Sequence, residues 1–357
     1  MKEEPEDIPA RPVGPHEASQ RSPLQVSWYP EPPAAAGATG PVVAIGTFDG
    51  VHRGHQAIVA CAARMAHQRG VPCVALTFHP PPREVLQPDS SPARLCSLDQ
   101  RLDLLLAAGA HACCVLGFDH HLARQSARAF VDGVLAELLQ ASGVVAGYNF
   151  RFGHNREGNA ATLRELAQSR GMAVEVVGPV TWQGQEVSST AVRRWVAQGE
   201  VEQAAAVLGR PFAVRGEVVA GSGRGRRLGF PTANVRVDER QLLPADGVYL
   251  AWLDLFPGPR SDTVVASLAV VSRRPTFSPA GERWLEVHAL GEGGSWYGRR
   301  VEVGFLQRLR PIRTFAGAQE LVAQMEQDRR EALARFGRQT VLSKSGWHGS
   351  LSNPSGL

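Results

Sequence analysis

The sequence contains no apolar run of the length that a membrane-spanning helix requires, so we expect no such span. It also carries little net charge, because 38 Lys and Arg residues face 34 Asp and Glu residues, a balance of +4. The densest basic stretch, residues 224–227, is short and contains a glycine. This charge is too small to indicate a nucleic-acid-binding face and favours a small polyanion as the partner of that stretch. The sequence does not indicate an oligomeric state.

Cysteines are few and show no spacing typical of metal binding or redox chemistry. None of the five forms a CxxC pair, and all lie in or beside apolar segments: Cys61, Cys73, Cys96, Cys113 and Cys114. This pattern is typical of reduced, structural thiols. The amino terminus is acidic and contains proline, without the apolar core of a signal peptide. We therefore expect a cytoplasmic protein.

The length of 357 residues favours two domains. Residues 41–198 alternate short apolar runs with amphipathic stretches, which predicts an α/β fold whose parallel sheet is covered by helices on both faces. Residues 199–338 contain six strand-like segments and a closing helix, which predicts an antiparallel barrel or sandwich. Residues 1–40 and 339–357 show little periodicity, and we expect a disordered arm and a disordered tail.

The sharpest local signal is VVAIGTFDGVHRGHQ, residues 42–56, in which a buried strand is followed by a glycine-rich turn and the start of a helix. In parallel sheets, ligands bind beyond the carboxyl ends of the strands, where the next helix offers free N–H groups to phosphate. Glycines let the backbone approach, and histidines can donate to a triphosphate as pyrophosphate departs: Gly46, Gly50, Gly54, His52 and His55. An isolated HxxH pair would more often cap a helix, but here the strand, the glycines and the helix start agree.

The second signal is GSGRGRRLGFPTANV, residues 221–235, a glycine-rich basic loop. Its glycines, Gly221, Gly225 and Gly229 among them, permit backbone amides to converge on phosphate. Thr232 and Asn234 supply oxygen atoms of the kind that Mg²⁺ prefers. The loop is not a Walker loop, because no GKS or GKT follows.

GTFDGVHRGH resembles the HxGH-type nucleotidyltransferases, in the form found in bacterial bifunctional riboflavin kinase/FMN adenylyltransferases. The resemblance continues in order along the chain, through FHPPPREVL, GYNFRFGHNREG, EVSSTAVR, AAAVLGRPF and PTAN. It covers residues 42 to about 336. The fold that it implies is a Rossmann-like HxGH nucleotidyltransferase domain followed by a six-stranded riboflavin-kinase β-barrel with a C-terminal helix.

The resemblance implies two ATP-dependent reactions, phosphorylation of riboflavin to FMN and adenylylation of FMN to FAD with release of pyrophosphate. Riboflavin, FMN and ATP would be the partners, and Mg²⁺ the cofactor. In the first domain, the resemblance implies that His52, His55 and Arg193 act in catalysis and that Asn149 lies near FMN. Further contacts with ATP implied by the same match are Gly46, Phe48, Gly54, Ser189 and Thr190.

In the second domain, the resemblance implies that Thr232 and Asn234 coordinate the metal that bridges the ATP phosphates, while residues 221–229 close over the nucleotide. Glu286 aligns with the glutamate that accepts the proton of the riboflavin 5′-hydroxyl. Within WLEVHAL, Glu286 lies between Leu285 and Val287. In a strand, its side chain would therefore point to the face opposite to that of Leu285 and Val287. A carboxylate on a strand is ordinarily just exposed, and only the accompanying PTAN loop favours catalysis.

Each of three side chains of the first domain has two possible interpretations. Asp49 either assists a magnesium ion or is an ordinary turn residue. Phe150 and Phe152 either face a flavin or belong to the core.

The chain also departs from the family pattern. Val271 and Ser272 stand where many relatives carry Asn-Ile-Gly, Gly291 replaces an acidic residue, and residues 79–82 lack one. Two alternatives therefore stay open. One is a paralogue with the same chemistry on a modified flavin or another metabolite, and the other is a flavin-binding regulatory protein with impaired kinase activity.

Overall fold

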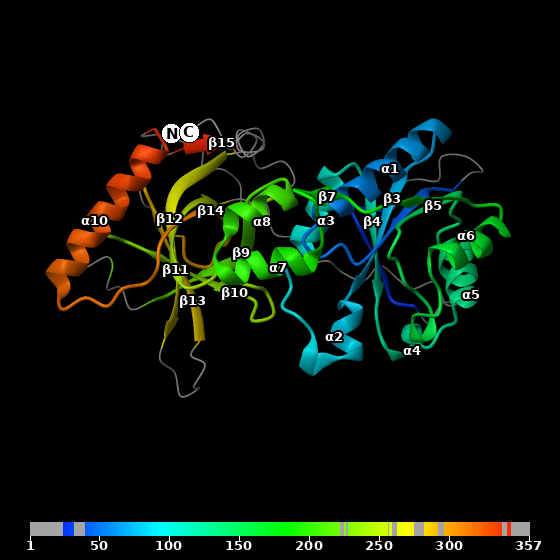
Figure 1. Cartoon of the computed structure of the whole chain (residues 1–357), viewed down its shortest axis with the longest axis horizontal. Helices are drawn as coiled ribbons and strands as arrows, with labels where there is room; N and C mark the ends of the chain where they lie inside the picture. Colours follow the sequence, from blue (N-terminus) through cyan, green and yellow to red (C-terminus); the bar gives the residue numbers. More distant parts are fainter. Residues whose placement is uncertain are drawn as a thin grey trace, which may run out of the picture.

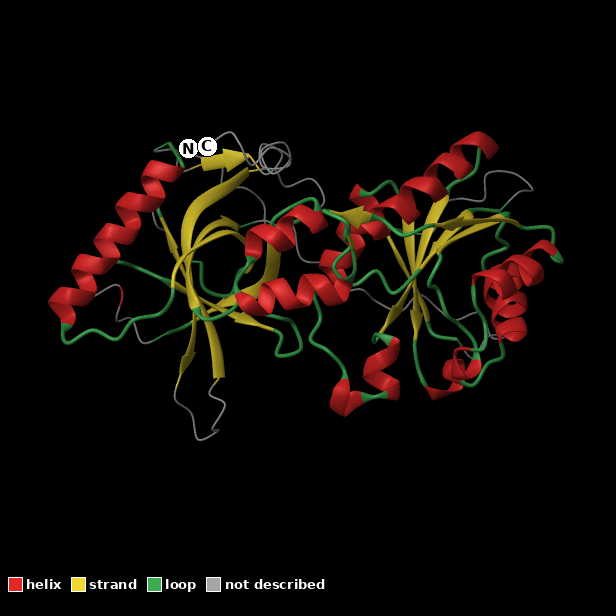
Figure 2. Cartoon of the chain, viewed as in Figure 1, coloured by secondary structure: helices red, strands yellow, loops and turns green. Residues whose placement is uncertain are grey.

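The computed structural model describes residues 24–31, 40–221, 225, 228–255, 257–258, 263–274, 282–291, 296–337 and 341–343. Two domains lie side by side, one built on a sheet and the other on a barrel (Figure 1). Helices α7 (Ser189–Gln198) and α8 (Val201–Leu208) connect the domains and lie between them. Helices flank the sheet of the first domain, whereas strands dominate the second (Figure 2).

The first domain contains a six-stranded sheet with the order β1-β4-β3-β2-β5-β6. Its strands are β1 (Val26–Tyr29), β2 (Val42–Ile45), β3 (Cys73–His79), β4 (Ala112–Gly117), β5 (Gly143–Gly147) and β6 (Ala173–Val177). Strands β2 to β6 run parallel, and β1 pairs antiparallel with β4. The strand order reverses between β2 and β5, which places a crevice at the carboxyl ends of these two strands.

Helices cover both faces of this sheet. They are α1 (Arg53–Arg69) and α3 (Leu98–Ala107) on one face, and α5 (Ala127–Phe130), η2 (Val131–Leu138) and α6 (Ala160–Gln168) on the other. Val42 and Ala44 of β2 pack with the first group, whereas Val43 and Ile45 pack with the second. This alternation is the period of two that a strand imposes. The predicted parallel sheet covered on both faces is confirmed.

Short elements surround the carboxyl ends of the strands. They are α2 (Pro82–Leu86), η1 (Pro88–Ser90), α4 (His120–Ala123) and η3 (His154–Arg156), followed later by the hairpin of β7 (Thr181–Trp182) and β8 (Gln185–Glu186). Helix α3 begins with the capping box of Ser97 and Gln100 that the sequence contains. Within the described ranges, no helix has the length and hydropathy of a membrane span.

The second domain is a closed barrel of six antiparallel strands. They are β9 (Phe212–Val219), β10 (Ala233–Val237), β11 (Gly247–Asp254), β12 (Thr263–Arg274), β13 (Glu282–Ala289) and β14 (Arg300–Arg310). Their order is β11-β14-β9-β10-β13-β12, and β12 pairs back onto β11. Side chains such as Val235 and Leu285 fill the interior, whereas α10 (Ala318–Arg335) packs outside, where Ala332 contacts the cluster around Trp252. The predicted barrel with a C-terminal helix is confirmed.

Two short strands correct the prediction of a disordered arm and tail. Strand β1 lies within residues 1–40, where Val26–Tyr29 pairs with residues 113–116. Its sequence VSWY combines β-branched and aromatic residues, and the pairing covers the edge of β4. Strand β15 (Val341–Ser343) lies within residues 339–357 and pairs with β12. Most of the remainder of both segments lies outside the described residues.

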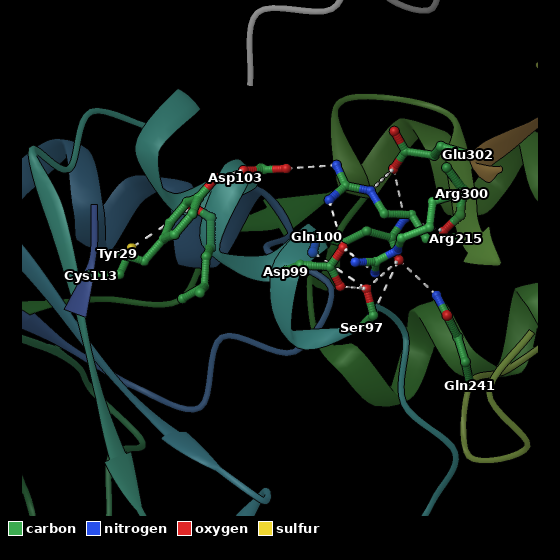
Figure 3. A network of polar contacts seen from close by, with 12 residues as sticks. Tyr29, Ser97, Asp99, Gln100, Asp103, Cys113, Arg215, Gln241, Arg300 and Glu302 are labelled. Carbon is green, nitrogen blue, oxygen red and sulfur yellow. Dashed lines mark hydrogen bonds and ion pairs between the residues drawn. The ribbon is translucent and has the colours of Figure 1, made fainter. Parts of the chain in front are cut away.

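A polar network joins the two domains (Figure 3). Arg215 of β9 donates to Asp99 of α3 at 3.0 Å and forms an ion pair with Asp103 of the same helix at 2.7 Å. Gln100, also on α3, donates to Glu302 of β14 at 2.7 Å. One face of α3 therefore belongs to the domain boundary.

Candidate active sites

A cavity of about 890 Å³ opens at the carboxyl ends of β2, β3 and β5. Gly46, Phe78 and Gly147 mark the ends of these strands in its wall. The wall also contains six arginines: Arg83, Arg94, Arg124, Arg151, Arg156 and Arg193. Its described acids, Asp49 and Glu84, both form ion pairs with arginine. This charge distribution suits a polyanion.

The glycine-rich turn brings Gly46 and Phe48 to the cavity wall. A Cβ on Gly46 would lie 3.0 Å from the Phe48 ring, so the close contact favours glycine. Phe48 itself has a left-handed φ of 51°, which is uncommon for a residue with a bulky side chain. Strained backbone of this kind gathers at ligand sites.

His52 and His55 lie together at the start of α1. His52 is the N-cap residue, and its Nδ1 accepts the N–H of His55 at 3.3 Å. The two rings stack with their centroids 3.6 Å apart. His55 lines the cavity, whereas His52 is 6% exposed and lies outside its described wall. A Cβ on Gly54 would lie 3.1 Å from the His52 ring, so Gly54 gives this ring room.

Both histidines are held in the neutral form. Burial, and after it the positive charge of Arg210, lowers the pKa of His52 to about 4. Burial, and after it the neighbouring His52, lowers the pKa of His55 well below its usual range. Because Nδ1 of His52 accepts a hydrogen bond, the proton of its neutral ring lies on Nε2, which is then a donor.

Helix α7 contributes Ser189 and Arg193 to the cavity wall. Ser189 donates to the carbonyl oxygen of Asp49 at 2.8 Å. Arg193 forms an ion pair with the Asp49 carboxylate and donates to the carbonyl oxygen of Ala93 at 2.7 Å. Thr190 is exposed in the first turn of α7 and is not among the described residues of the wall.

Asp49 uses its carboxylate within the protein. It accepts the N–H groups of Leu95 at 3.0 Å and Cys96 at 3.4 Å, besides its ion pair with Arg193. Only 9% of the residue is exposed. These contacts favour the interpretation as a structural turn residue over that of a magnesium ligand.

The loop after β5 supplies a further part of the cavity wall. Asn149 is exposed there and lines the cavity. Phe152 is 7% exposed and belongs to the core beneath η2 and α6, and Phe150 stacks on it with a centroid distance of 5.4 Å. Both rings also border the cavity. Phe152 is therefore a core residue whose edge reaches the wall.

A second cavity, of about 240 Å³, lies between the barrel and α10. Its wall includes Gly229, Thr232, His288, Gly291, Trp296, Tyr297 and, from α10, Arg329. Nδ1 of His288 lies 2.9 Å from the carbonyl oxygen of Pro231, a contact that joins β13 to the PTAN segment.

Asn234 and Glu286 stand directly opposite each other on β10 and β13. Residues opposite each other in a sheet share one face, and here it is the outer face, because Val235 and Leu285 belong to the barrel interior. The predicted alternation of Glu286 with buried leucine and valine is therefore confirmed.

The glycines of the basic loop pack onto the predicted metal ligands. A Cβ on Gly221 would lie 2.0 Å from Nδ2 of Asn234. A Cβ on Gly225 would lie 3.1 Å from Oγ1 of Thr232. The structure thus brings Gly221, Gly225, Thr232 and Asn234 together, and Gly229 lies in the wall of the adjoining cavity.

Comparison with known proteins agrees with this arrangement of two sites. A family model described as FAD synthetase matches residues 35–191, and one described as riboflavin kinase matches residues 208–336. A bifunctional riboflavin kinase/FMN adenylyltransferase of Pseudomonas fluorescens is 38% identical over 293 residues, which are 81% of this chain and 91% of that protein. The chain belongs to the bifunctional riboflavin kinase/FMN adenylyltransferase family.

Further relatives span both domains. The bifunctional riboflavin kinase/FMN adenylyltransferase of Escherichia coli (strain K12) is 35% identical over 299 residues, which are 84% of this chain and 93% of that protein. A solved structure from Streptococcus pneumoniae, described as a macrolide-efflux protein, has a TM-score of 0.73 and 31% identity, and the match covers 84% of this chain and 94% of that one. This family member is therefore an enzyme of flavin cofactor biosynthesis, with a kinase domain and a nucleotidyltransferase domain.

Most arginines of the first cavity could not be recognised from the sequence alone. Arg193 alone was singled out, whereas Arg83, Arg94, Arg124, Arg151 and Arg156 were not. A signal was present in RFGHNR, a stretch with several cationic residues that begins shortly after a predicted strand. In the structure, Asn155 and Arg156 have left-handed φ angles of 51° and 61°, which holds this loop at the cavity wall.

The departures from the family pattern differ in their position. Val271 is fully buried in the barrel interior and lies outside the described wall of the second cavity. Gly291, by contrast, lines that cavity together with Trp296, Tyr297 and Arg329. Of these positions, Gly291 is the one placed to affect what the second cavity accepts.

Proposed function

We propose that the first cavity is the site at which FMN is adenylylated. In this reaction an FMN phosphate oxygen attacks the α-phosphorus of ATP, and pyrophosphate leaves. Such a reaction requires alignment and charge neutralisation more than a protein nucleophile. The observation that supports the proposal most is the wall itself, in which His55 and six arginines surround a crevice at the carboxyl end of β2. Both described acids of this wall are already paired with arginine, so the remaining charge is positive.

The triphosphate would lie along the glycine-rich turn. His55 would donate to it, and the Nε2–H of His52, stacked on His55, would be available to the phosphate oxygens that become more negative as pyrophosphate departs. Ser189 and Thr190 open α7, whose first turn offers free N–H groups to phosphate. Arg193 would exchange part of its pairing with Asp49 for the ligand. Close approach of the backbone would involve Gly46, Phe48 and Gly54.

Asn149 would lie beside FMN on the far wall of the same cavity. It projects from the loop after β5, whereas Ser189 and Arg193 of the same wall come from α7. The arginines around it, such as Arg151 and Arg156, carry the charge that an FMN phosphate requires. ATP and FMN would thus contact different segments of one wall, with the reacting phosphates between them.

The second cavity would bind ATP with Mg²⁺ and phosphorylate riboflavin. Thr232 and Asn234 offer hydroxyl and amide oxygens, which are hard donors that suit Mg²⁺. Gly221 and Gly225 leave no room for a Cβ beside these two side chains, so the loop backbone closes over them. The residues present therefore fit the ion, which when bound would neutralise the ATP phosphates.

Glu286 would accept the proton of the riboflavin 5′-hydroxyl. It stands opposite Asn234 in the pairing of β10 with β13, so the base and a metal ligand share one face of the barrel. A positioned carboxylate of this kind raises the nucleophilicity of a hydroxyl at the moment of transfer. The hydroxyl and the γ-phosphate would thus meet at this face.

We place the domains of these two activities at residues 41–198 and 199–338. The boundary follows α7, because α7 is the last helix along the chain that brings side chains, Ser189 and Arg193, to the described wall of the first cavity. A cytoplasmic location is proposed from the five cysteines, which are all buried free thiols.

A product assay with two separate variants tests both assignments. Purified protein given riboflavin, ATP and Mg²⁺ should form FMN and then FAD. Glu286→Gln should lower riboflavin phosphorylation by about 10²- to 10⁴-fold and leave FMN adenylylation unchanged. His55→Gln should lower adenylylation by about 10²- to 10³-fold and leave phosphorylation unchanged. Loss of both activities in either variant, or of neither, contradicts the assignment of that site.

A further inference from the structure

Arg101 is a cation buried beneath the glycine-rich turn of the first cavity. It belongs to α3, and only 1% of its surface is exposed. Its Nη1 donates to the carbonyl oxygens of Thr47 at 2.9 Å and Phe78 at 3.1 Å, and to Oγ1 of Thr77 at 3.2 Å. These atoms lie at the carboxyl ends of β2 and β3. Its Nε and Nη2 have no hydrogen-bond partner among the described residues.

The structure shows no ion pair for Arg101 within the ranges that it describes. The acids of its own helix, Asp99 and Asp103, point toward the barrel and pair with Arg215 (Figure 3). The acid of the glycine-rich turn, Asp49, pairs with Arg193. An arginine cannot give up its proton, and a buried charge without a counterion is costly. Buried charges without a counterion are expected mainly at functional sites.

Arg101 acts on the cavity from behind its wall. Thr47 and Phe78 line the cavity, but Arg101 is not among the described lining residues. The carbonyl oxygens of both residues therefore point at a buried guanidinium. The charge of Arg101 also reaches His55, since it follows burial and His52 among the causes that lower the pKa of His55. Arg101 is thus near enough to influence a group in the cavity without touching it.

We propose that Arg101 is a positioning residue of the adenylyl-transfer site. It fixes the carboxyl ends of β2 and β3 by its hydrogen bonds. It also supplies a buried positive charge that favours binding of the ATP triphosphate and departure of pyrophosphate. This proposal rests on the function proposed above for the first cavity. A charge held inside the protein is screened less by salt than one at the surface. It is also fixed before the reaction, so no reorganisation is needed as negative charge develops on pyrophosphate.

Pyrophosphorolysis of FAD provides the test. In this reverse reaction a pyrophosphate oxygen attacks the adenylyl phosphorus of FAD, ATP forms and FMN leaves. Pyrophosphate reports on the adenylyl-transfer site alone, whereas ATP serves both sites. Two variants are compared: Arg101→Met removes the charge but keeps an unbranched chain, and Arg101→Lys keeps the charge.

The charge predicts different results for the two variants. Arg101→Met should raise the KM for pyrophosphate on the order of tenfold, with a smaller change in kcat. Arg101→Lys should stay within about threefold of the wild type, since its charge occupies nearly the same place. Riboflavin phosphorylation, measured on the same samples, should be unchanged in both variants.

Arg283→Met is the matched control. Arg283 also donates to two backbone carbonyl oxygens, those of Leu243 and Pro244, but it lies in the barrel. Its replacement should leave the KM for pyrophosphate unchanged.

Three results would overturn the proposal. An unchanged KM in Arg101→Met excludes a role for the charge. An increase on the order of tenfold in Arg101→Lys shows that guanidinium geometry alone matters, and this result decides the question even if Arg101→Met does not fold. An increase in Arg283→Met of the same size shows a general loss of packing. A wild-type protein without pyrophosphorolysis activity would instead contradict the proposed function of the first cavity.

Discussion

Arg215 of the barrel and Asp103 of helix α3 form an ion pair at 2.7 Å in which each side chain is less than one-tenth exposed. The same guanidinium reaches Asp99 at 3.0 Å and lies 3.5 Å from Glu302, so one cation serves three carboxylates at the domain boundary (Figure 3). The phenol of Tyr29 in β1 donates to Asp103 at 2.8 Å. Without the guanidinium, the three carboxylates would be left close together with less compensating charge.

Replacing Arg215 should therefore destabilise the protein strongly. We expect Arg215→Met to lower the free energy of unfolding by about 3–5 kcal/mol, because a buried ion-pair network loses its cation. Urea unfolding followed by circular dichroism measures this. Arg300→Ala is the control, since Arg300 pairs with the same Asp99 but is 63% exposed, and it should cost less than about 1 kcal/mol. Equal effects of the two substitutions would contradict the importance of the buried pair.

Much of the fold could be predicted because burial leaves a local pattern in the sequence. Strands β2, β3 and β5 are buried on both faces, and their sequences VVAI, CVALTFH and GVVAG are therefore mainly apolar. Leu285 and Val287 alternate with Glu286 because only one face of β13 meets the barrel core. The glycine-rich turn could also be predicted from the sequence, since its glycines and both histidines lie within one strand–turn–helix unit.

The remaining features depend on contacts between distant segments. Gln100 and Glu302 are 202 residues apart, and no local sequence pattern links them. Tyr29 pairs with Cys113 without a turn sequence between them that would predict a hairpin. Single polar side chains on loops, such as Arg94, leave no periodic trace, so tertiary packing alone places them in the cavity.

A second prediction concerns a residue of the kinase domain that supports the wall of the other site. Glu84 lines the first cavity and accepts hydrogen bonds from Arg94 at 2.6 Å and from Arg240 of the barrel at 2.7 Å. We expect Arg240→Ala to raise the KM values of FMN adenylylation by about two- to tenfold, because this part of the wall loses one of its two arginine contacts. Initial rates of adenylylation and phosphorylation on the same sample measure the effect.

The control for this prediction is Arg236→Ala. Arg236 is 67% exposed and pairs with Glu217 of the same barrel, so its loss should leave adenylylation unchanged. Arg240→Lys should recover part of the wild-type KM. A parallel fall of both activities in Arg240→Ala would indicate loss of structure and not a local effect on the wall.

A third prediction tests the contact between the basic loop and the proposed metal ligand. A Cβ at position 221 would lie 2.0 Å from Nδ2 of Asn234, so Gly221→Ala must displace that side chain. We expect riboflavin phosphorylation to fall by about 10- to 100-fold, as when support of a metal ligand is lost, while FMN adenylylation continues. Gly258→Ala is the control, because a Cβ there meets none of the described residues within 4 Å. Full phosphorylation activity in Gly221→Ala would argue against Asn234 as a ligand.

The last prediction concerns the protonation of His52. Burial, followed by the charge of Arg210, lowers its pKa from 6.5 to about 4 in the folded protein. Below pH 6.5 the unfolded chain binds a proton that the native ring does not take up, so stability is complete above this pH and is lost as the pH falls toward 4. The shift corresponds to about 3 kcal/mol. The contribution of His52 to the free energy of unfolding should therefore decrease by about 3 kcal/mol as the pH falls from 6.5 to 4.

His52→Asn isolates this contribution, since asparagine can cap α1 but does not titrate. The free energy of unfolding of the wild type minus that of His52→Asn should decrease by about 3 kcal/mol between pH 7 and pH 4. Urea titrations at four pH values in this interval measure the difference, and His55 is present in both proteins. A difference that stays constant with pH would mean that the native ring titrates as freely as the unfolded one. The ring of His52 would then be charged at mildly acidic pH. This result would contradict the proposal that a neutral His52 donates its Nε2–H to the phosphates.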